Sequence, residues 1–115
     1  MTFDTCIINN VHVITPRRHL VGGDETEALK AAVAELAAGG VPRVVVDLSK
    51  ISWVSSLGLS GLIRAKMSCD DHQGWLRLAC IGERIDSVLL VTRLERYFDT
   101  FDTVDDAVAA TAGHA

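Results

Sequence analysis

Near the start of the chain, apolar and β-branched residues predict two short strands joined by a tight turn. They occupy most of segment 3–15, and the pair Asn9-Asn10 interrupts them. Asn favours turns because its side chain can bond to nearby backbone groups, so this pair is expected to join the strands of a hairpin. Pro16 has no backbone N–H and is expected to end the second strand.

A helix is predicted over residues 25–38. Asp24 stands at the expected cap and Glu27 follows three residues later, which is the spacing of a capping box. Lys30 and Glu35 are expected to face water. Apolar side chains recur at intervals of three and four, the period of one helix face, at Leu29, Ala32, Val33 and Leu36. A glycine pair and a proline then end the helix.

The run Val44-Val45-Val46 is typical of a strand that is covered on both faces, at the centre of a sheet. From Ser55-Ser56 onward, apolar residues fall at helical spacing and predict a second helix. Its buried face would hold Leu59, Leu62, Ile63 and Met67. The polar segment 70–74 ends this helix.

The rest of the chain predicts further strands and helices in alternation. Residues 75–81 are expected to form a strand, and a short strand is expected near residues 100–101, before a last helix that Thr103 opens. Between the two strands, residues 85–94 predict an amphipathic helix whose inward side chains are Val88, Leu89 and Val91.

This order of elements implies an α/β fold. The sheet is expected to be mixed and mostly parallel, with about five strands and with helices packed against it. A chain of 115 residues accommodates one domain, expected over residues 1–110, and residues 111–115 are expected to form a frayed C-terminal tail.

Composition and charge narrow the range of functions. Hydrophobic residues make up 49% of the chain and charged residues 23%, which is enough apolar material for a folded core. No apolar stretch approaches the roughly 18 residues that cross a bilayer, so we expect a cytoplasmic protein with no membrane partner. The formal net charge is −4 and basic residues are not clustered, so no nucleic acid is expected as a partner.

The cysteines and histidines give no sign of a metal site. Cys6, Cys69 and Cys80 are an odd number at wide spacings, with no CxxC pair, which favours free and mostly buried thiols. The four histidines are scattered as well. We therefore expect no bound metal and no cofactor.

The absence of catalytic motifs weighs against an enzyme. The sequence contains no GxSxG, HExxH, P-loop or GxGxxG pattern. Asp24, Glu25 and Glu27 resemble paired catalytic carboxylates, but the first turn of a helix favours acids through its dipole in any case. We therefore expect a protein that works by binding.

One segment, residues 46–62, stands out as a candidate site. A buried strand ends there, a loop follows, and Ser55-Ser56 open a helix whose first turns contain Gly58 and Gly61. Either serine can cap the helix by accepting a hydrogen bond from a free backbone N–H. Each glycine costs about 0.5 to 1 kcal/mol in a helix, which suggests that a partner or a neighbouring backbone comes close.

This segment resembles the signature of STAS domains, the fold of bacterial anti-sigma factor antagonists. In that family a strand of the type VVVDLS and an apolar pair are followed by Asp-Ser-Ser-Gly-Leu-Gly at a helix start. The resemblance covers nearly the whole chain, from the early hairpin through GGDETEALKAAVAEL to VLLVTRLERYF and the last helix. It implies a STAS-like fold.

The resemblance also implies a switch. The first serine of the family motif is phosphorylated by a partner that is both anti-sigma factor and serine kinase; this position falls on Ser56, with Ser55 as the second choice. Unphosphorylated family members bind the anti-sigma factor, and phosphorylation breaks the complex. The partner-binding residues implied in this chain are Ser55, Ser56, Leu57, Gly58, Ser60 and Gly61.

The chain departs from the family motif at three positions. Ser55 replaces the Asp, Leu57 replaces the second serine, and Ser60 stands where a glycine is frequent. Two hypotheses follow: an anti-sigma factor antagonist that is switched off by phosphorylation at Ser56, or a STAS docking or scaffold module, without phosphorylation, in a larger signalling assembly. Both are compatible with a homodimer.

Overall fold

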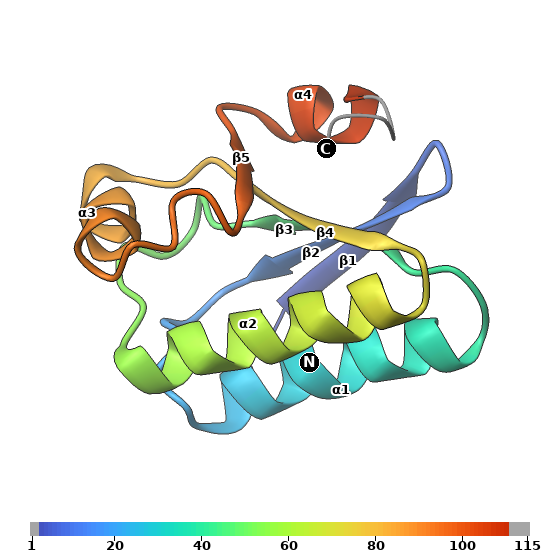
Figure 1. Ribbon diagram of the computed structural model, residues 1–115, viewed down its shortest axis with the longest axis horizontal. Helices are drawn as coiled ribbons and strands as arrows, with labels where there is room; N and C mark the ends of the chain where they lie inside the picture. The colour runs from blue at the N-terminus through green and yellow to red at the C-terminus, as the bar shows by residue number, and fades with distance from the viewer. Residues whose placement is uncertain (1–2, 111–115) are drawn as a thin grey trace.

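The computed structural model describes residues 3–110, which form a five-stranded sheet with helices on both faces (Figure 1). The strands are β1 (Phe3–Ile8), β2 (Val11–Pro16), β3 (Arg43–Asp47), β4 (Trp75–Ala79) and β5 (Asp99–Phe101). The helices are α1 (Asp24–Ala38), α2 (Ser56–Asp71), α3 (Glu83–Val91) and α4 (Val104–Ala109). The expected tail, residues 111–115, lies outside the described residues.

The strands follow their sequence order across the sheet. β1 pairs with β2 in the antiparallel sense, and β2 to β5 are parallel to one another. The predicted mixed, mostly parallel sheet is therefore confirmed. Asn9 and Asn10 join β1 to β2 with φ of 51° and 68°, the left-handed backbone that a two-residue hairpin turn needs.

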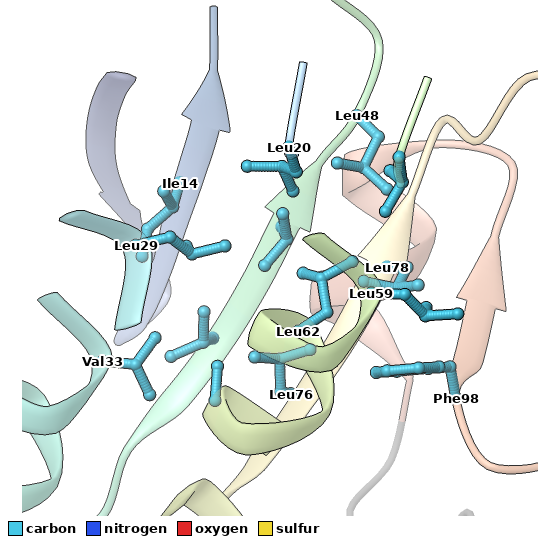
Figure 2. Packing of buried hydrophobic residues seen from close by; sticks show 14 of the residues in the cluster. Ile14, Leu20, Leu29, Val33, Leu48, Leu59, Leu62, Leu76, Leu78 and Phe98 are labelled. Atoms are coloured by element: carbon cyan, nitrogen blue, oxygen red, sulfur yellow. The ribbon is translucent and has the colours of Figure 1, made fainter. Parts of the chain in front are cut away.

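β3 lies at the centre of the sheet, with packed side chains on each face. Val44 and Val46 belong to the larger cluster, which faces α1, α2 and α3, and Val45 belongs to the smaller cluster, which faces α4. All three valines are fully buried, so the prediction of a strand covered on both faces is confirmed. Figure 2 shows the larger cluster, where helix residues meet the strands at Leu29, Val33, Leu59 and Leu62.

The start of α1 differs from the predicted capping box, which is wrong. The N-cap is Gly23, which has no side chain to bond, and Asp24 already belongs to the helix. Instead, Thr26 Oγ1 accepts a hydrogen bond from the Gly22 N–H at 2.9 Å. Thr26 and its neighbour Glu25 are buried, so side chains within the first turn fix the preceding loop.

Three further side chains are exposed, although the sequence predicted them to be buried. Met67 of α2 is 51% exposed and Val91, the last residue of α3, is 83% exposed. Cys6 is also exposed, and Cys69 is the one fully buried free cysteine among the described residues. The two helical residues lie at the margin of an apolar stripe, where spacing alone does not decide which side faces a neighbouring element.

Candidate functional site

The start of α2 is held against the loop that follows β2. Leu20 in that loop and Val54, just before α2, form an isolated parallel bridge. The Ser55 N–H donates a hydrogen bond to the Leu20 carbonyl oxygen at 2.9 Å. Backbone contacts between two distant segments therefore fix the position of the candidate site.

The two serines of the site have different surroundings. Ser55 is the N-cap of α2, and its Oγ accepts a hydrogen bond from the Gly58 N–H at 3.1 Å. Its carbonyl oxygen accepts the first helical bond, from the Leu59 N–H at 2.8 Å. Ser56 is the first residue of α2 and is exposed. The capping role that the sequence offered to either serine thus belongs to Ser55.

Contacts within the chain explain both glycines at the start of α2. Gly58 and Gly61 are buried. A Cβ on Gly58 would lie 1.8 Å from the Leu20 carbonyl oxygen, and a Cβ on Gly61 would lie 2.3 Å from Cγ2 of Thr26 in α1. The sequence suggested that a partner or a neighbouring backbone comes close to these glycines. A neighbouring backbone explains Gly58, whereas a neighbouring side chain explains Gly61. Direct contact of either glycine with a partner stays a prediction.

Exposed apolar side chains lie on the segments that meet at the start of α2. Leu57 is 66% exposed, Val21 in the β2–α1 loop is 47% exposed, and Trp53 in the β3–α2 loop is 37% exposed. Leu57 packs against the β2–α1 loop: a Cβ added to Gly22 would lie 2.6 Å from the Cβ of Leu57. Sequence reasoning singled out Leu57, and it included Trp53 in the candidate segment 46–62 without giving it a role. It missed Val21, which carries no motif and is brought beside α2 only by the meeting of the β2–α1 loop with the start of that helix.

A shallow groove continues this surface toward α3. Trp53, Arg84, Val88 and Val91 are among the residues that line it, and its volume is about 370 Å³. The Arg84 guanidinium carbon lies 5.1 Å from the centre of the Trp53 ring, within the range of a cation–π contact. We call Val21, Trp53, Ser56, Leu57 and Ser60 the α2 surface; Ser60 is exposed like Ser56.

Neither a metal site nor a membrane-spanning helix occurs in the part of the chain that the structure describes. Within residues 3–110, no three His, Cys, Asp or Glu side chains gather in a way that would hold a metal ion. None of the helices described is both long enough and apolar enough to cross a bilayer.

Comparisons with known proteins agree with this architecture. The family model described as "STAS domain" matches residues 4–107. A relative from Thermotoga neapolitana, named as a candidate anti-sigma factor antagonist, is 23% identical over 107 residues, which are 93% of this chain and 95% of the relative.

Two solved structures share the fold. The crystal structure of a candidate anti-sigma factor antagonist from Thermotoga maritima has a TM-score of 0.84 at 22% identity, and the match covers 92% of this chain and 91% of that one. The anti-sigma factor antagonist SpoIIAA, solved in its unphosphorylated form, has a TM-score of 0.70 at 13% identity over 92% and 93% of the two chains. At these identities the two structures support the fold alone.

Proposed function

This chain belongs to the STAS domain family, and we propose that it is an anti-sigma factor antagonist. In this proposal it binds an anti-sigma factor that is also a serine kinase, in the cytoplasm, and phosphorylation at Ser56 switches it off. The observation that carries the proposal is the arrangement of the two serines: Ser56 is exposed beside apolar side chains, whereas the Ser55 hydroxyl is engaged as the helix cap.

The α2 surface supplies the apolar contact that such a complex needs. Fully burying a Leu or Val side chain that starts fully exposed is worth about 1.5 to 3 kcal/mol, before the cost of association is subtracted. Leu57 is the most exposed of the three apolar side chains and is the neighbour of Ser56. We therefore expect Leu57 to be the main apolar contact with the anti-sigma factor.

A phosphate at Ser56 would act on the interface and spare the fold. It adds about −1.5 to −2 charges, which the N-terminus of a helix accommodates through its free N–H groups and its dipole. The Ser55 cap is a separate side chain and stays in place. The same charges would have to be desolvated in an apolar interface, so the complex with the anti-sigma factor would be lost.

Phosphosite mapping by mass spectrometry, after incubation of the purified protein with ATP and a lysate of its own host, tests the modification. We expect phosphate on Ser56, its loss in Ser56→Ala and its persistence in Ser55→Ala. A lysate that labels a known antagonist but leaves Ser56 unmodified would contradict the proposed switch.

Binding measurements with the purified anti-sigma factor test the surface. Ser56→Asp is expected to abolish the complex, and Leu57→Ala to weaken it by at least about tenfold. Cys6→Ser, an exposed change on β1, serves as the matched control and is expected to bind normally. A complex that tolerates Ser56→Asp together with a bulky residue at Ser60 would place the interface elsewhere.

The alternative is a STAS docking or scaffold module without phosphorylation. The altered triplet Ser55-Ser56-Leu57 favours it, because the Asp before the phosphorylated serine and the serine after it in the family motif are both absent from this chain. This alternative predicts no phosphate transfer in a competent lysate and a stable complex that tolerates Ser56→Asp.

A further inference from the structure

The two edges of the sheet differ in how open they are to another strand. β5 has three residues, and Asp99 within it and Asp102 directly after it place negative charges at that edge. Short strands and charged side chains are common protections of a sheet edge. β1 has six residues, no Pro and no Lys, and its pairing with β2 is continuous without a bulge. The β1 edge therefore lacks these protections.

The one charged residue of β1 is balanced from within the chain. Asp4 forms an ion pair with Arg17, and the Lys50 Nζ lies 3.9 Å from the same carboxylate. The hydrogen bond from Arg17 also holds the pKa of the Asp4 carboxyl below its usual value. An approaching strand would thus meet a compensated charge at this edge.

The hairpin turn determines which backbone groups of β1 are open. A two-residue turn closes on a hydrogen-bonded pair, here Ile8 and Val11, and the pairs alternate from there along the ladder. Phe3, Thr5 and Ile7 therefore direct their N–H and C=O groups away from β2. These three residues also share one face of the strand, because side chains alternate with a period of two.

We propose that two copies of this chain associate through β1, in antiparallel pairing about a two-fold axis at Thr5, to form one continuous sheet. In this register Thr5 lies opposite Thr5 of the second copy, and Phe3 lies opposite Ile7 of the second copy. The three open residues of each copy then satisfy one another with about six backbone hydrogen bonds. Asp4 lies opposite Cys6, so no like charges face each other directly.

An apolar groove beside β1 fits the same partner. Phe3, Thr5 and Ile14 line it together with residues of α1 that include Ala28 and Leu36, and its volume is about 590 Å³. Ile7, on the same face of β1 as Phe3, is 65% exposed in the single chain. In the dimer, Ile7 of the second copy lies next to Phe3 at this groove and is withdrawn from water. The edge is therefore complementary to itself in both its backbone and its side chains.

Sedimentation equilibrium of the full chain over a range of concentrations tests the proposal. We expect the mass to rise with concentration toward that of two chains. Thr5→Pro removes an N–H that points away from β2, so the hairpin keeps its bonds while dimerisation weakens by at least about tenfold. Thr5→Val keeps the N–H and a β-branched side chain, and is expected to dimerise like the wild type.

Two further measurements keep the proposal testable if Thr5→Pro fails to fold. Ile7→Lys places a charge opposite Phe3 of the second copy and is expected to give a monomer with an unchanged circular dichroism spectrum. In the dimer, the amides of Phe3, Thr5 and Ile7 should gain protection from hydrogen exchange. A chain that stays monomeric at all concentrations, or a dimer that survives Ile7→Lys without protection of these amides, would overturn the proposal.

Discussion

The carbonyl oxygen of Leu20 fills the space in which a side chain at Gly58 would lie, because a Cβ there would be 1.8 Å from that oxygen. The close approach lets the backbone of the β2–α1 loop meet the first turn of α2. Val21 directly follows Leu20, so the same approach brings it together with the other residues of the α2 surface. Because Gly58 has no side chain, the β2–α1 and β3–α2 loops can meet there and form the α2 surface together.

Gly58→Ala is expected to destabilise the fold by about 2 to 4 kcal/mol, because the added methyl group meets rigid backbone. Urea unfolding measures the change. Gly82→Ala is the control for the contact, since Gly82 is the N-cap of α3 and its added Cβ would have no atom within 4 Å apart from those of its chain neighbours. The control is expected to lose less than about 1 kcal/mol. Equal losses in the two variants would show that the contact with Leu20 is unimportant.

Gly61 and Thr26 are expected to be coupled in a double-mutant cycle. A Cβ on Gly61 would collide with Thr26 Cγ2, so Gly61→Ala alone should destabilise the packing of α1 on α2. Thr26→Ser removes that methyl group and keeps the hydroxyl that accepts from the Gly22 N–H. The loss of unfolding free energy in the double variant should therefore be smaller than the sum of the losses in the two single variants, by about 0.5 to 2 kcal/mol. Additive losses in urea unfolding would contradict the contact.

Ser55→Ala and Ser56→Ala are expected to differ in stability. Loss of the Ser55 cap leaves the Gly58 N–H without its side-chain acceptor and should cost about 1 kcal/mol. Ser55→Asp keeps a side-chain acceptor for the Gly58 N–H and should therefore retain most of the stability that Ser55→Ala loses. Ser56 is exposed, so Ser56→Ala should change the free energy of unfolding by less than about 0.5 kcal/mol. Thermal unfolding compares the three variants, and a larger loss at Ser56 than at Ser55 would reverse the roles assigned here.

Cys69 is expected to be unreactive in the folded protein. Burial, with a smaller effect of Asp70, raises the pKa of its thiol from 9.0 to about 12. Only the thiolate reacts with iodoacetamide, so at pH 8 the exposed Cys6 should be alkylated rapidly and Cys69 only after unfolding. Peptide mapping after timed alkylation checks this, and rapid labelling of Cys69 in the folded chain would contradict its burial.

The same pKa shift makes stability depend on pH at the alkaline end. The folded state holds the Cys69 proton more tightly than the unfolded state does, so its contribution is complete below about pH 9 and is lost as pH rises toward 12. Cys69→Ala lacks this dependence. We therefore expect the difference in urea midpoint between the wild type and Cys69→Ala to shrink between pH 8 and pH 10. A constant difference would mean that the thiol titrates alike in both states.

Local patterns determined much of this fold before any tertiary contact was known. The run of three valines at 44–46 predicted a strand buried on both faces, and Asn9-Asn10 predicted a hairpin, because burial on two faces and a two-residue turn each restrict the residue types within a few positions. The sequence also singled out Ser55 and Ser56 as the start of α2.

Only the tertiary structure decided the features that depend on which distant segments meet. From the sequence, either Ser55 or Ser56 could cap α2 while the other remained exposed. The hydrogen bond from the Gly58 N–H to the Ser55 hydroxyl shows that Ser55 is the cap. The N-cap of α1 is Gly23 and not Asp24, and the Thr26 hydroxyl of the first turn bonds to the Gly22 N–H of the preceding loop. Met67 and Val91 are exposed because no neighbouring element covers the side of the helix on which each of them lies. Periodicity is a property of one segment, whereas burial and close approach are properties of two.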